Sequence, residues 1–104
     1  MAKLDYFVIH AETESEWVGV DVELQFICED HITIIDCDGV ADDVDISRLL
    51  ICLKTLFEEE TSCGYEVKQY IGGFRHKVSI FGAEVSDPSF SFDCDRIEIK
   101  ERDN

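Results

Sequence analysis

The sequence predicts an α+β fold, in which a mainly antiparallel β-sheet of about six strands carries one amphipathic helix in the order βββ-α-βββ. Two patterns carry this prediction. One is a run in which apolar and polar residues alternate, and the other is a later run of apolar residues at helical spacing. The length of 104 residues is typical of a single domain, so we expect one domain over residues 1–104. A sheet of this size can curl or split into a sandwich.

Three strands are expected before the helix. The segment Leu4–Ala11 is rich in aromatic and β-branched residues, and the polar segment Glu12–Glu16 suits a hairpin connection. In Val18–Cys28 every even-numbered residue is apolar, which is the period of a strand with one buried face. The next two residues, Glu29 and Asp30, predict a turn, and His31–Cys37 predicts a short third strand. The three strands are expected to form an antiparallel meander.

An amphipathic helix is expected after the acidic segment Asp36–Asp45. Apolar residues recur there at spacings of three and four, namely Ile46, Leu49, Leu50, Leu53, Leu56 and Phe57. Asp45 suits the N-cap position, because its side chain can accept a hydrogen bond from a free backbone N–H of the first turn. Gly64 is the expected stop.

Three further strands are expected after the helix. Tyr65–Ile71 and Phe74–Ala83 alternate again and are joined by Gly72 and Gly73, which suit a tight hairpin or a bulge. The last strand region is Phe90–Lys100, in which the apolar residues of the two halves fall in opposite phases. A bulge near Asp95 would reconcile the two phases.

The predicted core combines the apolar phase of the second strand with the apolar stripe of the helix and residues of the last two strands. It comprises Val18, Val20, Val22, Leu24, Phe26, Leu49, Leu50, Leu53, Phe57, Val78, Ile80, Phe90 and Phe92.

Charge and cysteine content narrow the functional classes. With 24 acidic against 9 basic residues the formal net charge is −15, which repels phosphate backbones and anionic lipids. We therefore expect no direct binding of nucleic acid or membranes. The five cysteines show no metal-type spacing, and their odd number favours free thiols and a cytoplasmic location. No run of 18 apolar residues occurs, and Asp5 interrupts any signal-peptide pattern.

No pattern of a catalytic, metal or cofactor site is found, and we expect neither enzymatic activity nor a cofactor. The segment Asp36–Asp45 holds five aspartates, but Gly39 follows Asp38 directly and the twelfth position is Ser47, so the spacing does not match an EF-hand loop. The three histidines lie in different segments and outside any nucleophile motif. A small metal-dependent hydrolase using Asp36, Asp38 and His31 is kept as an alternative.

The acidic residues are segregated along the chain. Residues 1–47 hold 13 acidic residues and one base, whereas residues 48–104 hold 11 acidic residues and 8 bases. A one-sided negative field attracts a basic partner. The expected partner-binding residues are eight acids of this first half together with one aromatic anchor: Asp21, Glu23, Glu29, Asp30, Asp36, Asp38, Asp42, Asp43 and Trp17. Reversing Asp36, Asp38 and Asp42 is expected to weaken binding more than reversing Glu98, Glu101 and Asp103.

In its size, its strongly acidic charge and its strands around one helix, the chain resembles bacterial immunity proteins, including those of contact-dependent growth inhibition systems. The resemblance implies an inhibitor that binds a basic toxin, of nuclease type, and occludes its active site. A second binding hypothesis is a phage-type mimic of nucleic acid that blocks a defence enzyme.

Overall fold

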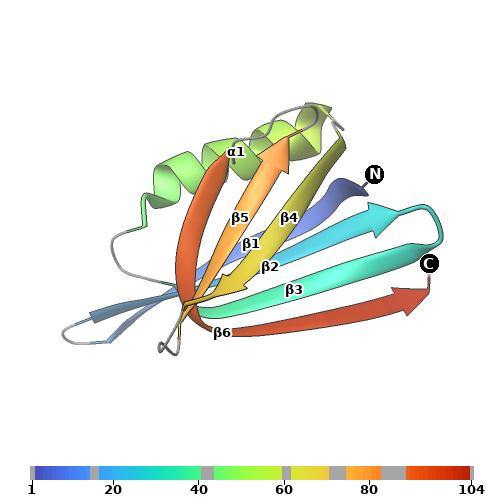
Figure 1. Ribbon diagram of the computed structural model, residues 1–104. Helices are drawn as coiled ribbons and strands as arrows, with labels where there is room; N and C mark the ends of the chain where they lie inside the picture. The colour runs from blue at the N-terminus through green and yellow to red at the C-terminus, as the bar shows by residue number, and fades with distance from the viewer. Residues whose placement is uncertain are drawn as a thin grey trace.

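The computed structural model describes residues 2–14, 17–40, 44–59, 62–70, 75–82 and 89–103. Within these ranges six antiparallel strands form a closed β-barrel in the order β1-β2-β3-β6-β5-β4, with one helix (Figure 1). The strands are β1 (Ala2–Glu14), β2 (Trp17–Cys28), β3 (His31–Val40), β4 (Ser62–Gln69), β5 (His76–Gly82) and β6 (Phe90–Asp103), and the helix is α1 (Ile46–Glu59). The predicted class and the order βββ-α-βββ are confirmed.

The strands are longer than the sequence patterns indicate. β1 continues to Glu14, which pairs with Trp17, so most of the expected hairpin connection is strand. β3 continues to Val40, so Asp36 and Asp38 lie in a strand and not in an acidic loop. Polar residues extend these strands because partner strands supply backbone hydrogen bonds whatever the side chain. The connection through Gly72 and Gly73 lies outside the described residues.

The helix α1 begins where the sequence predicts and ends before the predicted stop. The Arg48 backbone N–H donates to the Asp45 carboxylate at 3.1 Å, which confirms Asp45 as the N-cap. α1 ends at Glu59, and Gly64 lies inside β4, where it cannot terminate the helix. No helix of the described segments is long and apolar enough to cross a membrane.

The core fills the barrel and the space between the barrel and α1. Leu49, Leu53 and Leu56 form the buried stripe of the helix, and Leu49 and Leu53 are fully buried. Leu50 and Phe57, predicted as core residues, are instead 46% and 45% exposed, because the buried stripe is narrower than the apolar pattern. Phe90 is only half-buried, and the side chain of Val18 lies outside the described part. The remaining predicted core residues are buried, namely Val20, Val22, Leu24, Phe26, Leu49, Leu53, Val78, Ile80 and Phe92.

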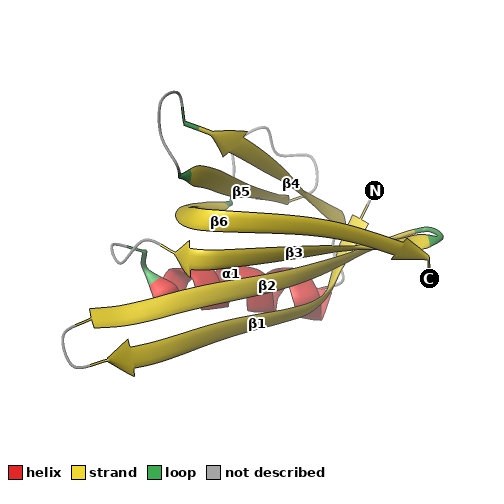
Figure 2. Ribbon diagram, turned by 90° about the horizontal axis from the view of Figure 1, so that it is seen from below, coloured by secondary structure: helices red, strands yellow, loops and turns green. Residues whose placement is uncertain are grey.

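One side of the barrel is covered by α1, and the opposite side carries no helix among the described residues. α1 packs mainly against β1, where the rings of Phe7 and Phe57 meet edge to face with centroids 6.2 Å apart. Seen from below, β2 passes in front of the helix, with β1 and β3 on either side of it (Figure 2). Their outer face is therefore not covered by α1.

β3 and β6 both change the face that they turn to the core at the point where Gly39 meets Asp95. In β3 the next buried residue after Cys37 is Val40, three positions later. In β6 the next inward-facing residue after the buried Cys94 is the half-buried Ile97, also three positions later. The register of β3 against β6 does not shift across this point. The bulge predicted near Asp95 is therefore not found in the β3–β6 pairing. The change of face instead coincides with a distortion of β3, where Gly39 has a φ of 67°.

Replacing Gly39 with alanine is expected to lower the free energy of unfolding by about 1–2 kcal/mol, because an L residue is strained at positive φ. The added Cβ would also lie 2.8 Å from the Asp95 carboxylate, which must move aside. Gly64→Ala is the matched control, since a Cβ there meets nothing within 4 Å. Chemical denaturation measures both variants, and equal losses would contradict the strain at Gly39.

Candidate functional site

The strand register places carboxylates of three strands side by side. Glu23 of β2 lies opposite Asp36 of β3, and Asp36 lies opposite Glu98 of β6. Since side chains alternate across a strand and Val22 and Leu24 are buried, the Glu23 row lies on the outer face of the sheet. The next row holds Asp21 and Asp38. We name Asp21, Glu23, Asp36, Asp38 and Glu98 the acidic face.

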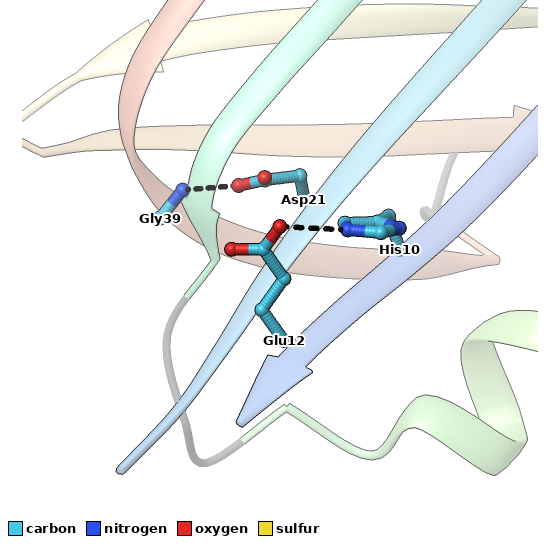
Figure 3. A network of polar contacts seen from close by, with 4 residues as sticks. All are labelled: His10, Glu12, Asp21 and Gly39. Carbon is cyan, nitrogen blue, oxygen red and sulfur yellow. Dashed lines mark hydrogen bonds and ion pairs between the residues drawn. The ribbon is translucent and has the colours of Figure 1, made fainter. Parts of the chain in front are cut away.

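Asp21 ties β2 to β3 at the end of the acidic face. The Gly39 backbone N–H donates to Asp21 Oδ1 at 3.1 Å (Figure 3). This bond lies beyond the last paired residues of the two strands, Val22 and Cys37. On the neighbouring strand β1, the His10 ring nitrogen Nε2 and Glu12 Oε1 are 3.1 Å apart. The carboxylates of Asp21 and Glu12 therefore lie on the same side of the β1–β2 ribbon.

The pKa of the Asp36 carboxyl is raised by its surroundings on the acidic face. Partial burial, a hydrogen bond with the Glu23 side chain and the Glu23 charge raise the pKa of Asp36, and the nearby Lys100 ammonium opposes the rise. Like charges directly opposite each other destabilise a sheet. The Glu23–Asp36 pair is thus held by the fold in spite of mutual repulsion.

Asp36→Asn is expected to raise the free energy of unfolding at pH 7 by about 0.2–1 kcal/mol, the usual size of a cross-strand charge pair. Because the pKa of Asp36 is raised in the folded state, ionisation of this group costs stability as the pH rises through that pKa. The gain should disappear below the usual aspartate value of 3.8, where the carboxyl is protonated in both states. Denaturant melts of wild type and variant across this pH range measure the effect.

Asp38→Asn is the control for this prediction. Asp38 lies opposite Arg96 of β6 as well as in the row of Asp21, so it has a base on one side and an acid on the other, and its removal should bring a smaller gain at pH 7 than that of Asp36. A loss of stability in Asp36→Asn at pH 7 would contradict the repulsion between Glu23 and Asp36.

Apolar side chains adjoin the carboxylates on the same outer face. Val8 of β1 lies opposite Glu23 and is 37% exposed. The adjacent row runs from Tyr6 of β1 through Gln25 of β2 to Ile34 of β3. In this row Tyr6 is 46% exposed and Ile34 is half-buried. The acidic face is therefore bordered by exposed apolar surface.

The structure brings only part of the predicted set together. Asp21, Glu23, Asp36 and Asp38 share the acidic face, and Glu29 and Asp30 lie in the β2–β3 turn. Glu29 is six residues along the strand direction from Glu23, which corresponds to roughly 20 Å. Glu29 and Asp30 therefore lie apart from the acidic face. Asp42 and Asp43 lie outside the described residues.

Trp17 is the first residue of β2 and pairs with Glu14 at the end of the β1–β2 ribbon. The part of β2 from Trp17 to Asp21 pairs with β1 and with no other described strand. The backbone position of Trp17 is thus at the tip of a two-stranded ribbon, and its side chain lies outside the described part.

Glu98 was missed as a site residue, because β6 lies beside β3 although two strands and the helix separate them in the chain. Glu98 belongs to the same face as Asp36. Charge reversal at Glu98, Glu101 and Asp103 is therefore not a clean control for charge reversal at Asp36, Asp38 and Asp42. β6 also brings Arg96 and Lys100 next to the acids. Acidic and basic residues are therefore less separated in the folded protein than along the chain. No local pattern signals this pairing.

The residues of the hydrolase alternative are not assembled. His31 begins β3, five residues before Asp36, and its Nδ1 is 3.4 Å from Asp30 Oδ1. Five residues of strand span roughly 17 Å, too far for a shared site with Asp36 and Asp38. Within the described ranges, no group of three or more His, Cys, Asp or Glu side chains could hold a metal ion.

Comparison with known proteins adds no family to this description. No family model matches the chain, and neither the curated proteins nor the solved structures hold a significant match. The geometry of the acidic face is therefore the basis of the functional proposal.

Proposed function

We propose that this protein is a non-enzymatic inhibitor that binds a basic protein, a toxin of nuclease type, and occludes its active site with the acidic face. The observation that carries the proposal is the row of Glu23, Asp36 and Glu98 across three neighbouring strands. The opposed pair Glu23 and Asp36 costs stability in the free protein, whereas Glu98 is ion-paired with Lys100 at 3.5 Å. A basic partner removes this cost, because its cations replace carboxylate repulsion with attraction.

A nuclease suits this face for a chemical reason. Its active-site cleft binds phosphates and so carries lysine and arginine side chains that are already placed for anions. Directly opposed residues in neighbouring strands have Cβ atoms about 4.5–5.5 Å apart, so adjacent carboxylates can meet adjacent cations. The long-range negative field of a chain with net charge −15 would also raise the rate of encounter with a basic domain.

The apolar residues beside the carboxylates supply the second component of binding. Tyr6 and Val8 have exposed apolar surface in the free protein and would bury it against the partner. Salt screens the charge pairing but does not screen this burial of apolar surface.

The experiment tests inhibition at defined stoichiometry. Candidate toxin domains are the basic C-terminal domains of large proteins encoded beside this chain, purified and assayed as nucleases. We expect the nuclease activity of the cognate domain to fall linearly with added protein and to vanish at one equivalent. Full nuclease activity in the presence of a demonstrated complex would contradict active-site occlusion.

A further inference from the structure

One side of β4 lacks a partner strand along most of its length. β1 pairs with β4 at Ala2–Cys63 and Lys3–Ser62, and from this end the two strands run apart (Figure 2). Beyond Cys63, β4 pairs with β5 and with no other described strand, and α1 packs mainly against β1. The backbone N–H and C=O groups that point to this side can therefore pair with a further strand. We name Gly64–Gln69 the free edge of β4.

The side chains of the free edge are divided between the two faces of the sheet. Tyr65 stacks on the core residue Phe26 with ring centroids 5.3 Å apart, and Val67 packs against the core. Glu66 and Lys68 therefore lie on the outer face, where both are exposed. Their charged groups form an ion pair at 3.1 Å along the strand. The outer row thus holds one negative and one positive charge, two positions apart.

The charge of the β4–β5 hairpin differs from that of the rest of the chain. The segment Ser62–Gly82 holds one acidic residue and three lysines or arginines, although the whole chain has a net charge of −15. β1 also has a side without a described partner strand, but its segment Asp5–Glu14 holds three acidic residues and no lysine or arginine. A second copy of this acidic chain would be repelled at β1 but not at the free edge of β4.

If the free edge pairs with its own copy, charge and face pattern select one antiparallel register. Centred on Val67, this register places Glu66 opposite Lys68 of the second copy and, by symmetry, Lys68 opposite Glu66 of the second copy. A shift by one residue would bring inner side chains of one copy opposite outer side chains of the other. A shift by two would place Glu66 opposite Glu66 or Lys68 opposite Lys68, and like charges directly opposite are unfavourable.

We propose that two copies of this chain associate through the free edge of β4, antiparallel and centred on Val67, so that their β4–β5 hairpins join into one sheet. Backbone hydrogen bonds between the two β4 strands hold the dimer, and Glu66 and Lys68 pair across the strands. A short strand pair is a small interface, so the dimer is weak and reversible. The free edge and the acidic face lie on different strands, and the dimer does not rest on the proposed inhibitor function.

Sedimentation equilibrium of the full chain tests the dimer at about 0.15 M salt, where the long-range repulsion between two negative chains is largely screened. We expect a reversible monomer–dimer equilibrium for the wild type. Glu66→Lys and Lys68→Glu each place like charges opposite each other twice, so each should weaken the dimer at least about tenfold. Circular dichroism checks that both variants are folded. A wild-type chain that stays monomeric up to about 1 mM would overturn the proposal.

A mixture of the two variants assigns the contact to this register. In the mixed dimer the lysines of Glu66→Lys lie opposite the glutamates of Lys68→Glu, so an equimolar mixture should dimerise although neither variant does so alone. Glu58→Lys and Lys54→Glu are the controls, because they make the same charge changes at an exposed ion pair of α1 and should leave the wild-type dimer unchanged. A mixture that stays monomeric, or equal weakening by the controls, would contradict pairing through the free edge.

Discussion

Leu53→Ala is expected to lower the free energy of unfolding by about 2–5 kcal/mol. Leu53 is fully buried at the centre of the α1 stripe that packs on the barrel, so alanine removes buried methyl groups and leaves a cavity. Such a loss is a large part of the stability of a domain of this size. Urea or guanidinium unfolding followed by circular dichroism measures the change.

Leu50→Ala is the matched control, because it removes the same atoms three positions earlier on the same helix. Leu50 is 46% exposed, and its loss should cost less than about 1 kcal/mol. The sequence pattern alone treats the two leucines alike. A large loss in Leu50→Ala, or a small one in Leu53→Ala, would mean that α1 packs on the barrel through a different stripe.

Reversing two neighbouring charges of the acidic face is expected to have the largest effect on partner binding. Glu23→Lys combined with Asp36→Lys places two ammonium groups where the partner's cations would lie, so the association rate should fall by roughly tenfold or more. Complex stability should fall as well, because like charges are then brought together in the bound state. Surface binding kinetics against the cognate basic domain measures both rates.

Glu58→Lys combined with Glu66→Lys is the control pair. It changes the net charge by the same amount, but Glu58 lies on α1 and Glu66 on β4, away from the acidic face. The difference between the two pairs therefore isolates position from overall charge. If both pairs slow association equally, only the overall field guides binding.

The elements of the fold could be read from the sequence because they depend on local patterns. The alternation through Leu24 and Phe26 predicts β2, and the spacing of Leu49 and Leu53 predicts α1. Barrel closure could not be predicted. It depends on the pairing of Ala2 and Lys3 with β4 and on the pairing of β3 with β6. These contacts join segments far apart in the chain, and many registers satisfy the same local pattern.

The site could be predicted only in part, for the same reason. Glu23 and Asp36 lie on consecutive strands of a meander, so their proximity follows from the local hairpin. The position of Glu98 beside Asp36 depends on β6, and the position of Asp38 in a strand depends on the long β3–β6 ladder. Exposure of Leu50 and Phe57 likewise depends on how α1 sits on the barrel, which the helical period does not specify.

Binding through the acidic face is tested by the footprint of the cognate basic domain on this chain, measured by NMR cross-saturation in the complex. The acidic face predicts that saturation reaches the backbone amides around Glu23 and Asp36 and their apolar neighbours Tyr6 and Val8. The amides of β4 around Glu66 should remain unaffected, since they lie on another part of the barrel. A footprint centred on β4 and β5, with none on β2 and β3, would contradict binding through the acidic face.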